Sequence, residues 1–308
     1  AMTDLAIPRV PSRRVRIVAL DIDGTSIRDD GTVSDAVVDA VARARGVGVH
    51  VVPCTGRPFQ VGVGAVAERL GLHPRHEGDV AAQAIVRNGA AAVDLPAGRV
   101  RWEEVLAGAH GPAIVEVIKG VGATPVVEEA PTAGARMFTW DDHLAHPAAK
   151  HYAHAWMRID DIEPVPHEAL RRAALRTTWI GACGDYQTTR AAFEALAPFA
   201  RGDDPVELFW SGTWLPADRP NHVVGVRPSH VHKAFGLARY AADLGLTLAD
   251  CVAVGDEMND VEMLREVGFG VAMGQAQPAL KAVSRAVVAS NQDDGVAEAI
   301  ERFVLPYA

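Results

Sequence analysis

VRIVALDIDGT, residues 15–25, is the stretch that decides the fold. Its first part, Val15–Leu20, is a short apolar run rich in β-branched residues, which is typical of a strand buried on both faces of a sheet. The acidic loop Asp21–Thr25 follows at once, where such a strand would end. Ligand crevices of open α/β sheets lie beyond the carboxyl ends of the strands, so this stretch predicts an α/β fold with a site in that loop.

Strands and helices alternate in residues 14–90 and again in residues 226–308. The apolar runs 47–54 and 84–89 are further strands of the first segment, and 251–256 is a buried strand of the second. Strands that alternate with helices imply a parallel sheet with right-handed crossovers. We therefore predict an α/β, doubly wound parallel-sheet (Rossmann-like) core.

The pattern changes between these two segments, in residues 91–225. Helical and strand-like stretches are mixed there, and all six tryptophans of the chain lie in this region. Such a shift in composition indicates a separate module with its own core. We expect two domains: a core formed by 14–90 and 226–308, and an inserted α+β domain formed by 91–225.

The composition limits the partners and the compartment. The 308 residues are 49% hydrophobic and 22% charged, and the formal net charge of −9 gives no general attraction for nucleic acid or anionic lipid. No apolar stretch approaches the roughly 20 residues that span a bilayer, and Val15–Leu20 is too short for a secretory signal. Three scattered cysteines fit a reducing compartment. We expect a cytoplasmic protein with no nucleic-acid or membrane partner; the oligomeric state is not readable.

Two loops after predicted strands carry groups suited to phosphate chemistry. In DIDGT, Asp21 and Asp23 can enter one pocket, where one carboxylate acts as a nucleophile and metal ligand and the other exchanges a proton. In CTGR, residues 54–57, the Thr55 hydroxyl and the loop amides can hold phosphoryl oxygens. The alternatives are an acidic turn of purely backbone origin and a Thr-Gly turn that caps the next helix.

A third loop, GDEMND at residues 255–260, also follows a buried strand. Asp256 and Asp260 are one helical turn apart and can face the same side, and Mg²⁺ prefers such oxygen ligands. The alternative is an acidic helix N-terminus favoured by the helix dipole. Lys233, near the start of a helix, is either a site cation or a solvated surface residue. Three polar loops after three buried strands should meet at one sheet edge, which favours a shared site.

In this order, DIDGT, TGR, Lys233 and GDEMND resemble the four motifs of the haloacid dehalogenase-like phosphohydrolases. The insertion between TGR and the lysine resembles the Cof-like branch with a type-II cap, as do RNGA at 87–90 and DDGVAEAI at 293–300. The resemblance covers both core segments. One departure is that His232 and Ala234 flank the lysine, where the branch usually has Ser and Gly.

The resemblance implies a mechanism and a set of site residues. Asp21 would attack phosphorus and form an aspartyl-phosphate, Asp23 would act as general acid and base, and Lys233 would offset negative charge. The implied catalytic residues are Asp21, Asp23, Thr55 and Lys233. The implied Mg²⁺ ligands are Asp21, Asp23 (through its main-chain carbonyl), Asp256 and Asp260. The implied phosphate-binding and substrate-binding residues are Gly24, Thr25, Thr55, Gly56, Arg57, Asn88, Lys233 and Asn259.

The leading hypothesis is a Mg²⁺-dependent phosphatase that acts on a small phosphorylated metabolite, such as a sugar phosphate. A phosphomutase of the phosphomannomutase type and a non-catalytic phospho-ligand-binding protein are the alternatives. Two further features stay open. The run His143, His146, His151 and His154 is either a structural zinc site or a solvated helix. Of Trp210 and Trp214, which flank a short turn, either one stacks on a substrate or both pack the inserted domain.

Overall fold

The computed structural model describes residues 10–73, 82–95, 97–141, 162–213 and 221–308. The chain divides into two compact units. Unit 1 comprises residues 1–101 and 232–308, and unit 2 comprises residues 102–231. In the described ranges, no helix is both long enough and apolar enough to cross a membrane. The predicted His143–His154 run and Trp214 lie outside the described residues.

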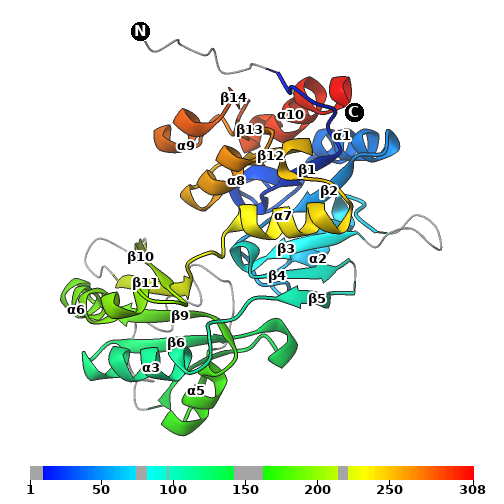
Figure 1. Ribbon diagram of the computed structural model, residues 1–308. Coiled ribbons are helices and arrows are strands. Elements are labelled where there is room, and N and C mark those ends of the chain that lie inside the picture. The colour runs from blue at the N-terminus through cyan, green and yellow to red at the C-terminus, as the bar shows by residue number, and fades with distance from the viewer. Residues whose placement is uncertain (1–9, 74–81, 96, 142–161, 214–220) are drawn as a thin grey trace. The chain divides into compact units, whose positions relative to one another are not determined.

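Unit 1 is built on a five-stranded parallel sheet with the order β14-β13-β12-β1-β2. Its strands are β1 (Ile17–Leu20), β2 (His50–Pro53), β12 (Cys251–Gly255), β13 (Phe269–Ala272) and β14 (Ala286–Val287). Its helices are α1 (Asp35–Gly46), α2 (Val63–Arg69), α7 (Lys233–Asp243), α8 (Val261–Glu266), α9 (Pro278–Val283) and α10 (Gly295–Phe303). Figure 1 shows α1 and α10 over one face of the sheet and α7 and α8 over the other, so the predicted doubly wound core is confirmed.

The strand order reverses beside β1. This strand pairs with β2 on one side and with β12, which is some 200 residues away in the chain, on the other. All four residues of β1 are at most 1% exposed, as expected for a central strand covered on both faces. The loops after β1 and β12 therefore leave the sheet side by side, at the position where α/β sheets open a crevice.

A small three-stranded sheet completes unit 1. It contains β3 (Gln83–Val86), β4 (Ala91–Asp94) and β5 (Arg99–Glu103), in that order. A parallel bridge between Cys54 and Ile85 joins β3 to the end of β2. This connection brings the turn after β3, residues 87–89, to the loop after β2.

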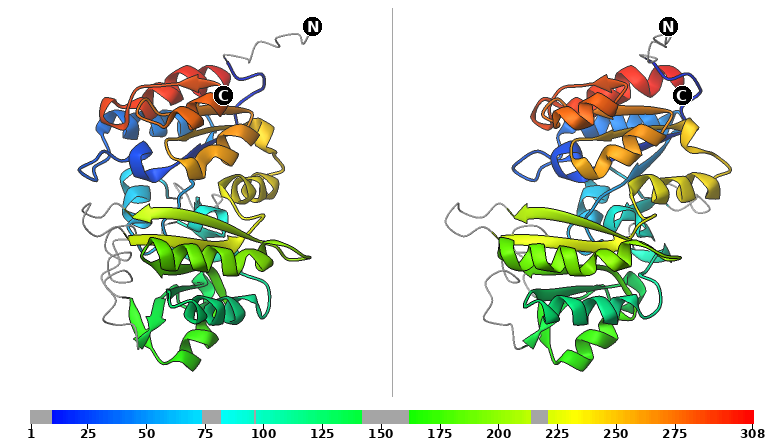
Figure 2. Two further views of the ribbon diagram at one scale, coloured as in Figure 1. Left: turned by 90° about the vertical axis from the view of Figure 1, so that its left-hand side faces the viewer. Right: turned by 60° about the vertical axis from the view of Figure 1, so that its left-hand side comes forward.

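Unit 2 has its own six-stranded sheet, with the order β10-β11-β9-β6-β7-β8. Its strands are β6 (Thr124–Glu129), β7 (Met137–Trp140), β8 (Glu163–Val165), β9 (Thr177–Gly184), β10 (Val206–Thr213) and β11 (Asn221–Pro228). The described helices α3 (His110–Gly120), α5 (His167–Ala174) and α6 (Tyr186–Leu196) pack on one face of this sheet (Figures 1 and 2). Ile114, Leu170 and Ile180 belong to the hydrophobic core between them.

Candidate active site

The carboxyl edge of the parallel sheet gathers the three polar loops of unit 1. Asp21 follows β1, Thr55 follows β2 across Cys54, and Asp256 follows β12. Asp21, Thr55 and Asp256 are all buried. Residues that are far apart in the chain therefore converge because the strands that precede them are neighbours in one parallel sheet.

Lys233 is the centre of a buried charge cluster. Its Nζ donates to Oδ1 of Asp21 at 2.6 Å and to Oδ1 of Asp260 at 2.7 Å. The Lys233 side chain is fully buried, and so is that of Asp260. Lys233 is the first residue of α7, and the side chain of His232 caps that helix by accepting from the Phe235 amide at 3.2 Å.

Burial and charge act together on the ionisation of this cluster. Burial raises the pKa of Asp21 well above its ordinary value, the Lys233 ammonium opposes this shift, and the Asp260 carboxylate adds to it. Burial alone would lower the pKa of Lys233, but the Asp21 and Asp260 carboxylates outweigh it and raise that pKa. Burial and the neighbouring Asp260 raise the pKa of Asp256 to about 6. Three acids facing one ammonium leave an excess of negative charge that favours a bound cation.

The loop after β1 is pressed against Asp256. Oγ1 of Thr25 donates to Oδ1 of Asp256 at 3.1 Å. Gly24 has a left-handed φ of 67°, and a Cβ at this position would lie 2.2 Å from Oδ2 of Asp256. Only glycine provides both this backbone conformation and this close approach, which explains why the loop contains it.

Asp260 has all its oxygens engaged inside the protein. Oδ2 accepts from the backbone amides of Asp256 and Glu257, each at 3.1 Å, and Oδ1 accepts from Lys233. A Cβ at Gly255 would lie 2.4 Å from Cγ of Asp260, so the carboxylate is packed tightly against its own loop. Asp260 thus holds both the ammonium and the backbone that carries Asp256.

The side chain of Asp23 lies apart from this cluster. Its carboxylate accepts two hydrogen bonds from Arg57, from Nε at 2.7 Å and from Nη2 at 2.5 Å. The Asp23 side chain is 59% exposed, whereas that of Arg57 is 13% exposed. The structure therefore pairs Asp23 with the loop after β2 and leaves its carboxylate in contact with solvent.

The other predicted residues, in the loop after β2 and in the asparagine pair Asn88 and Asn259, contact one another. Oγ1 of Thr55 accepts from the Arg57 amide at 3.1 Å, which shapes the loop after β2. Nδ2 of Asn259 donates to Oδ1 of Asn88 at 2.9 Å. A Cβ at Gly56 would lie 3.1 Å from Oδ1 of Asn88, so this loop passes close to the asparagine pair.

The acidic cluster fits a hard divalent cation. One carboxylate oxygen from each of Asp21, Asp256 and Asp260 lies within 4.8 Å of the other two, and all three residues are buried. The donors are all oxygen atoms, which Mg²⁺ and Ca²⁺ prefer over the nitrogen and sulfur ligands of zinc. The side chain of Asp23 is not part of this group.

The sequence analysis missed Gln275. Its Nε2 donates to the carbonyl of Gly24 at 2.5 Å and lies 3.5 Å from Oδ2 of Asp256. Its Oε1 accepts from the Asn291 amide at 3.3 Å. Gln275 follows β13 in the same sheet, so the rule that picked out the other three loops could also have identified it.

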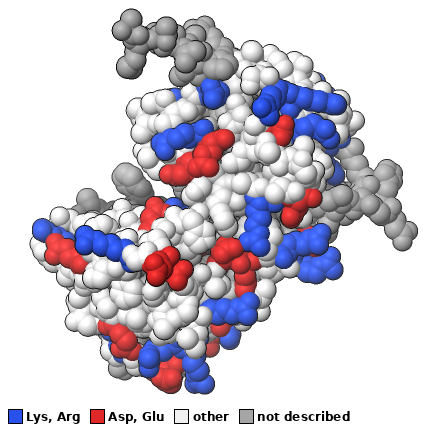
Figure 3. Space-filling model, viewed as in Figure 1, with Lys and Arg blue, Asp and Glu red and all other residues white. Residues whose placement is uncertain are grey.

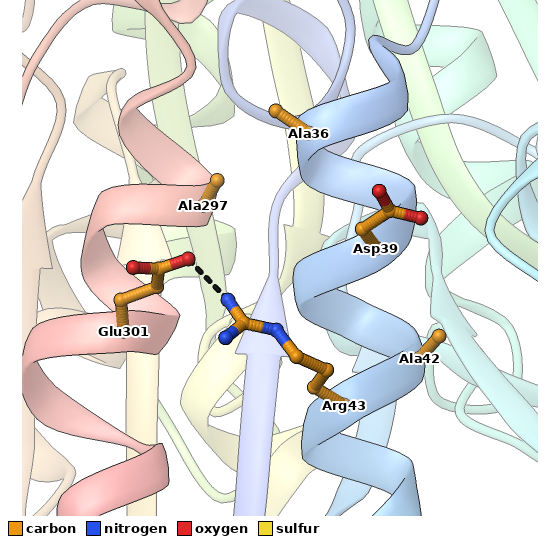
Figure 4. Close-up of a pocket in the computed structure, with 6 residues that line it drawn as sticks. All are labelled: Ala36, Asp39, Ala42, Arg43, Ala297 and Glu301. Atoms are coloured by element: carbon orange, nitrogen blue, oxygen red, sulfur yellow. Dashed lines mark hydrogen bonds and ion pairs between the residues drawn. The ribbon is translucent and has the colours of Figure 1, made fainter.

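Two surface features lie outside this cluster. A groove runs between α1 and α10, and Arg43 and Glu301 form an ion pair across it (Figure 4). It is lined by Ala36, Asp39, Ala42, Arg43, Ala297 and Glu301, none of which belongs to the cluster. On the face shown in Figure 3, basic and acidic side chains are intermingled.

The chain matches known proteins over most of its length. Pyridoxal phosphate phosphatase of Escherichia coli is 26% identical, over 92% of this chain and 97% of that protein. A 5-amino-6-(5-phospho-D-ribitylamino)uracil phosphatase of Bacillus subtilis is 25% identical, over 94% and 96% respectively. A solved sugar phosphatase of haloacid dehalogenase subclass IIB shares the fold, with a TM-score of 0.69 and 20% identity over 93% of this chain and 98% of that one.

The relatives and the site indicate the same class of protein, an enzyme that hydrolyses phosphoric monoesters. More particularly, the chain belongs to the haloacid dehalogenase-like hydrolase family, which it matches over residues 18–200 and 203–300. The resemblance expected from the four motifs is confirmed.

Proposed function

We propose that this enzyme is a Mg²⁺-dependent phosphatase of a small phosphorylated metabolite and that it works through an aspartyl-phosphate at Asp21. The observation that carries the proposal is the buried pairing of Asp21 with Lys233, beside Asp256 and Asp260. Each unit of negative charge on a phosphate repels a carboxylate about 4 Å away by roughly 4 kcal/mol at an effective dielectric near 20. A buried ammonium and a cation site supply the charge that reverses this repulsion.

The first half-reaction transfers the phosphoryl group to the protein. A carboxylate oxygen of Asp21 forms a bond to phosphorus while the bond between phosphorus and the leaving oxygen breaks. We assign to Asp23, whose carboxylate contacts Arg57 and solvent in this structure, the proton that goes to that leaving oxygen. Lys233 holds Asp21 in place and offsets the negative charge of the phosphoryl oxygens, and Thr55 binds one of those oxygens.

The second half-reaction releases phosphate. Asp23 accepts a proton from water as the water oxygen bonds to phosphorus, and the bond from phosphorus to Asp21 breaks. We assign the metal to the Asp21 and Asp256 carboxylates and the Asp23 main-chain carbonyl, with Asp260 orienting that loop. When bound, Mg²⁺ supplies positive charge against the phosphate and the buried carboxylates.

We further propose that the substrate is a compact phosphate ester, such as a sugar phosphate, and that unit 2 is the cap that selects it. Support comes from the relatives, which are named as phosphatases of 5-amino-6-(5-phospho-D-ribitylamino)uracil, of pyridoxal phosphate and of sugars. Unit 2 also has its own hydrophobic core and is inserted between the two segments of unit 1. A screen of phosphorylated metabolites with phosphate detection tests this. An isomerised product without free phosphate indicates a phosphomutase instead.

The nucleophile is tested by replacing Asp21 with Asn. We expect phosphate release to fall by about 10⁴-fold or more, because the attacking carboxylate is lost while the fold is kept. Acid quenching of wild type during turnover should trap a hydroxylamine-labile phosphoenzyme that Asp21→Asn lacks. Asp39→Asn, at an exposed position of α1, is the matched control. Mg²⁺-supported activity in Asp21→Asn, or full activity after chelation of divalent ions, contradicts the proposal.

A further inference from the structure

The turn that follows β3 has an unusual backbone. Arg87, Asn88 and Gly89 have φ values of 54°, 53° and 96°, so three consecutive residues are left-handed. Glycine adopts this region freely, asparagine tolerates it, and arginine does so at a steric cost. Backbone strain of this kind persists only where the surrounding structure enforces it, and it is concentrated at functional sites.

The turn is bonded to the loop that holds Thr55. The Asn88 amide donates to the Thr55 carbonyl at 2.9 Å, and the Arg87 amide donates to the Arg57 carbonyl at 3.1 Å. The Thr55 amide in turn donates to the Ile85 carbonyl at 2.9 Å. The path of residues 55–57 is therefore set by the left-handed turn beside it.

The same turn packs against the start of α7. A Cβ at Gly89 would lie 2.1 Å from the carbonyl oxygen of His232, the residue before Lys233. From the other side, a Cβ at Gly236 would lie 2.9 Å from Cα of Gly89. Two glycines thus allow the turn to touch the first turn of the helix that places Lys233.

The Asn88 side chain reaches the third loop. Its Oδ1 accepts from Nδ2 of Asn259 at 2.9 Å, and its amide group lies against Gly56. Oδ1 of Asn259 is buried and has no hydrogen-bond partner within the described ranges. The asparagine pair therefore joins the loop after β2 to the loop of Asp256.

We propose that the turn Arg87–Gly89 is the positioning element of this active site and that Asn88 is its central residue. It fixes the distances between Thr55, Lys233 and the Asp256 loop, and it does so through the side-chain amide of Asn88 as well as through its backbone. A turn that served only the fold would be better made with glycine at position 88, because glycine adopts φ near 53° without strain.

The experiment compares Asn88→Gly, Asn88→Ala and wild type, and it rests on the phosphatase activity proposed above. Both variants lose the side-chain amide, but only the alanine keeps the strain. We expect kcat/KM to fall about tenfold or more in both, mainly through kcat, since the loops are no longer held together. The thermal midpoint of Asn88→Ala should be about 2–4 °C below that of Asn88→Gly, because only the alanine keeps the strained backbone.

Ala135→Gly is the matched control, because Ala135 is also left-handed, with a φ of 57°, and lies in unit 2. It should raise the thermal midpoint by about 2–4 °C and leave kcat/KM unchanged. An Asn88→Gly variant that keeps wild-type kcat/KM overturns the proposal. Binding of inorganic phosphate with Mg²⁺, measured by calorimetry, provides a readout that does not need turnover. Weaker binding by both Asn88 variants, but not by Ala135→Gly, supports the positioning role even if no phosphate ester is hydrolysed by wild type.

Discussion

Replacing Lys233 with Met removes the ammonium from the buried cluster but keeps a side chain of similar length. In wild type this ammonium contacts Asp21 at 2.6 Å and Asp260 at 2.7 Å, with no exposed surface on the lysine side chain. The variant leaves both carboxylates buried without their cation. Removing one partner from a buried ion pair costs about 3–5 kcal/mol of folding stability.

This loss is large compared with the total stability of a domain, which is typically about 5–15 kcal/mol. For a unit of roughly 180 residues, it corresponds to a thermal midpoint lowered by about 6–20 °C. Activity should fall independently of stability. Loss of a charge that offsets roughly 4 kcal/mol of repulsion between Asp21 and one unit of negative charge on the phosphate corresponds to a decrease in kcat of about 10³-fold.

The two effects can be separated with a second substitution. In the double variant Lys233→Met/Asp260→Asn, the side-chain oxygen of the introduced asparagine can still accept from the backbone amides of its loop, and one buried charge is gone. We expect the thermal midpoint to recover by several degrees while kcat stays low. The assays are differential scanning calorimetry without metal and phosphate release at saturating Mg²⁺, both at a temperature where the variants are folded.

Lys119→Met is the control, because Lys119 lies over the Trp140 ring in unit 2, whereas the charge cluster belongs to unit 1. It should leave kcat unchanged. A Lys233→Met variant with wild-type kcat refutes the assignment of Lys233 to the phosphate site. An unchanged thermal midpoint refutes the claim that the ammonium stabilises the buried carboxylates.

Two further predictions concern the metal. The pKa of Asp256 in the metal-free fold is about 6, above the unfolded value of about 3.9, so the folded protein holds a proton that the unfolded chain releases. The folding stability of the metal-free protein should therefore fall as pH rises from about 4 to 6. The Mg²⁺ dissociation constant should rise about tenfold for each pH unit below 6, because the proton must leave before the metal binds. A dissociation constant that does not change between pH 5 and 7, measured by calorimetry, contradicts this. Gln275→Leu should weaken Mg²⁺ binding by about tenfold and leave kcat at saturating Mg²⁺ little changed, because Gln275 bridges the Gly24 carbonyl and Asp256. Gln277→Leu, whose wild-type amide contacts Glu257 instead, is its control, and equal constants for the two variants count against the bridge.

The site could be predicted to the extent that it depends on strand ends. Asp21 and Asp256 each follow a run that is apolar on both faces, and such runs identify central strands of a parallel sheet. The carboxyl ends of parallel strands lie at one edge, so the meeting of these two loops followed from the sequence. The four motifs were specific enough to indicate the family that the full-length match then confirmed.

Contacts between side chains could not be predicted in this way. The sequence did not indicate that Asp23 would turn away from the cluster to pair with Arg57, or that Gln275 would reach the Gly24 carbonyl. Such pairings depend on which rotamer a loop permits and on which neighbour is within reach, and neither has a periodic signal in the chain. The start of the inserted domain is a similar case. Residues 91–101 belong with unit 1, where β4 pairs with β3 as a hairpin, and the composition of this stretch does not reveal on which side of the boundary it falls.

By itself, the sequence determined the alternation of strands and helices in the core, the parallel sheet and the edge at which acidic and hydroxyl groups would collect, because hydrophobic periodicity and strand-end loops are local properties. Only the tertiary structure decided that Lys233 would be fully buried between Asp21 and Asp260, and that a left-handed turn at 87–89 would join three loops. An isolated lysine or a short polar turn carries the same local signal on a surface as in a site. The difference is made by the packing of segments some 200 residues apart, which changes both the solvation of each charge and the backbone angles that each loop can keep.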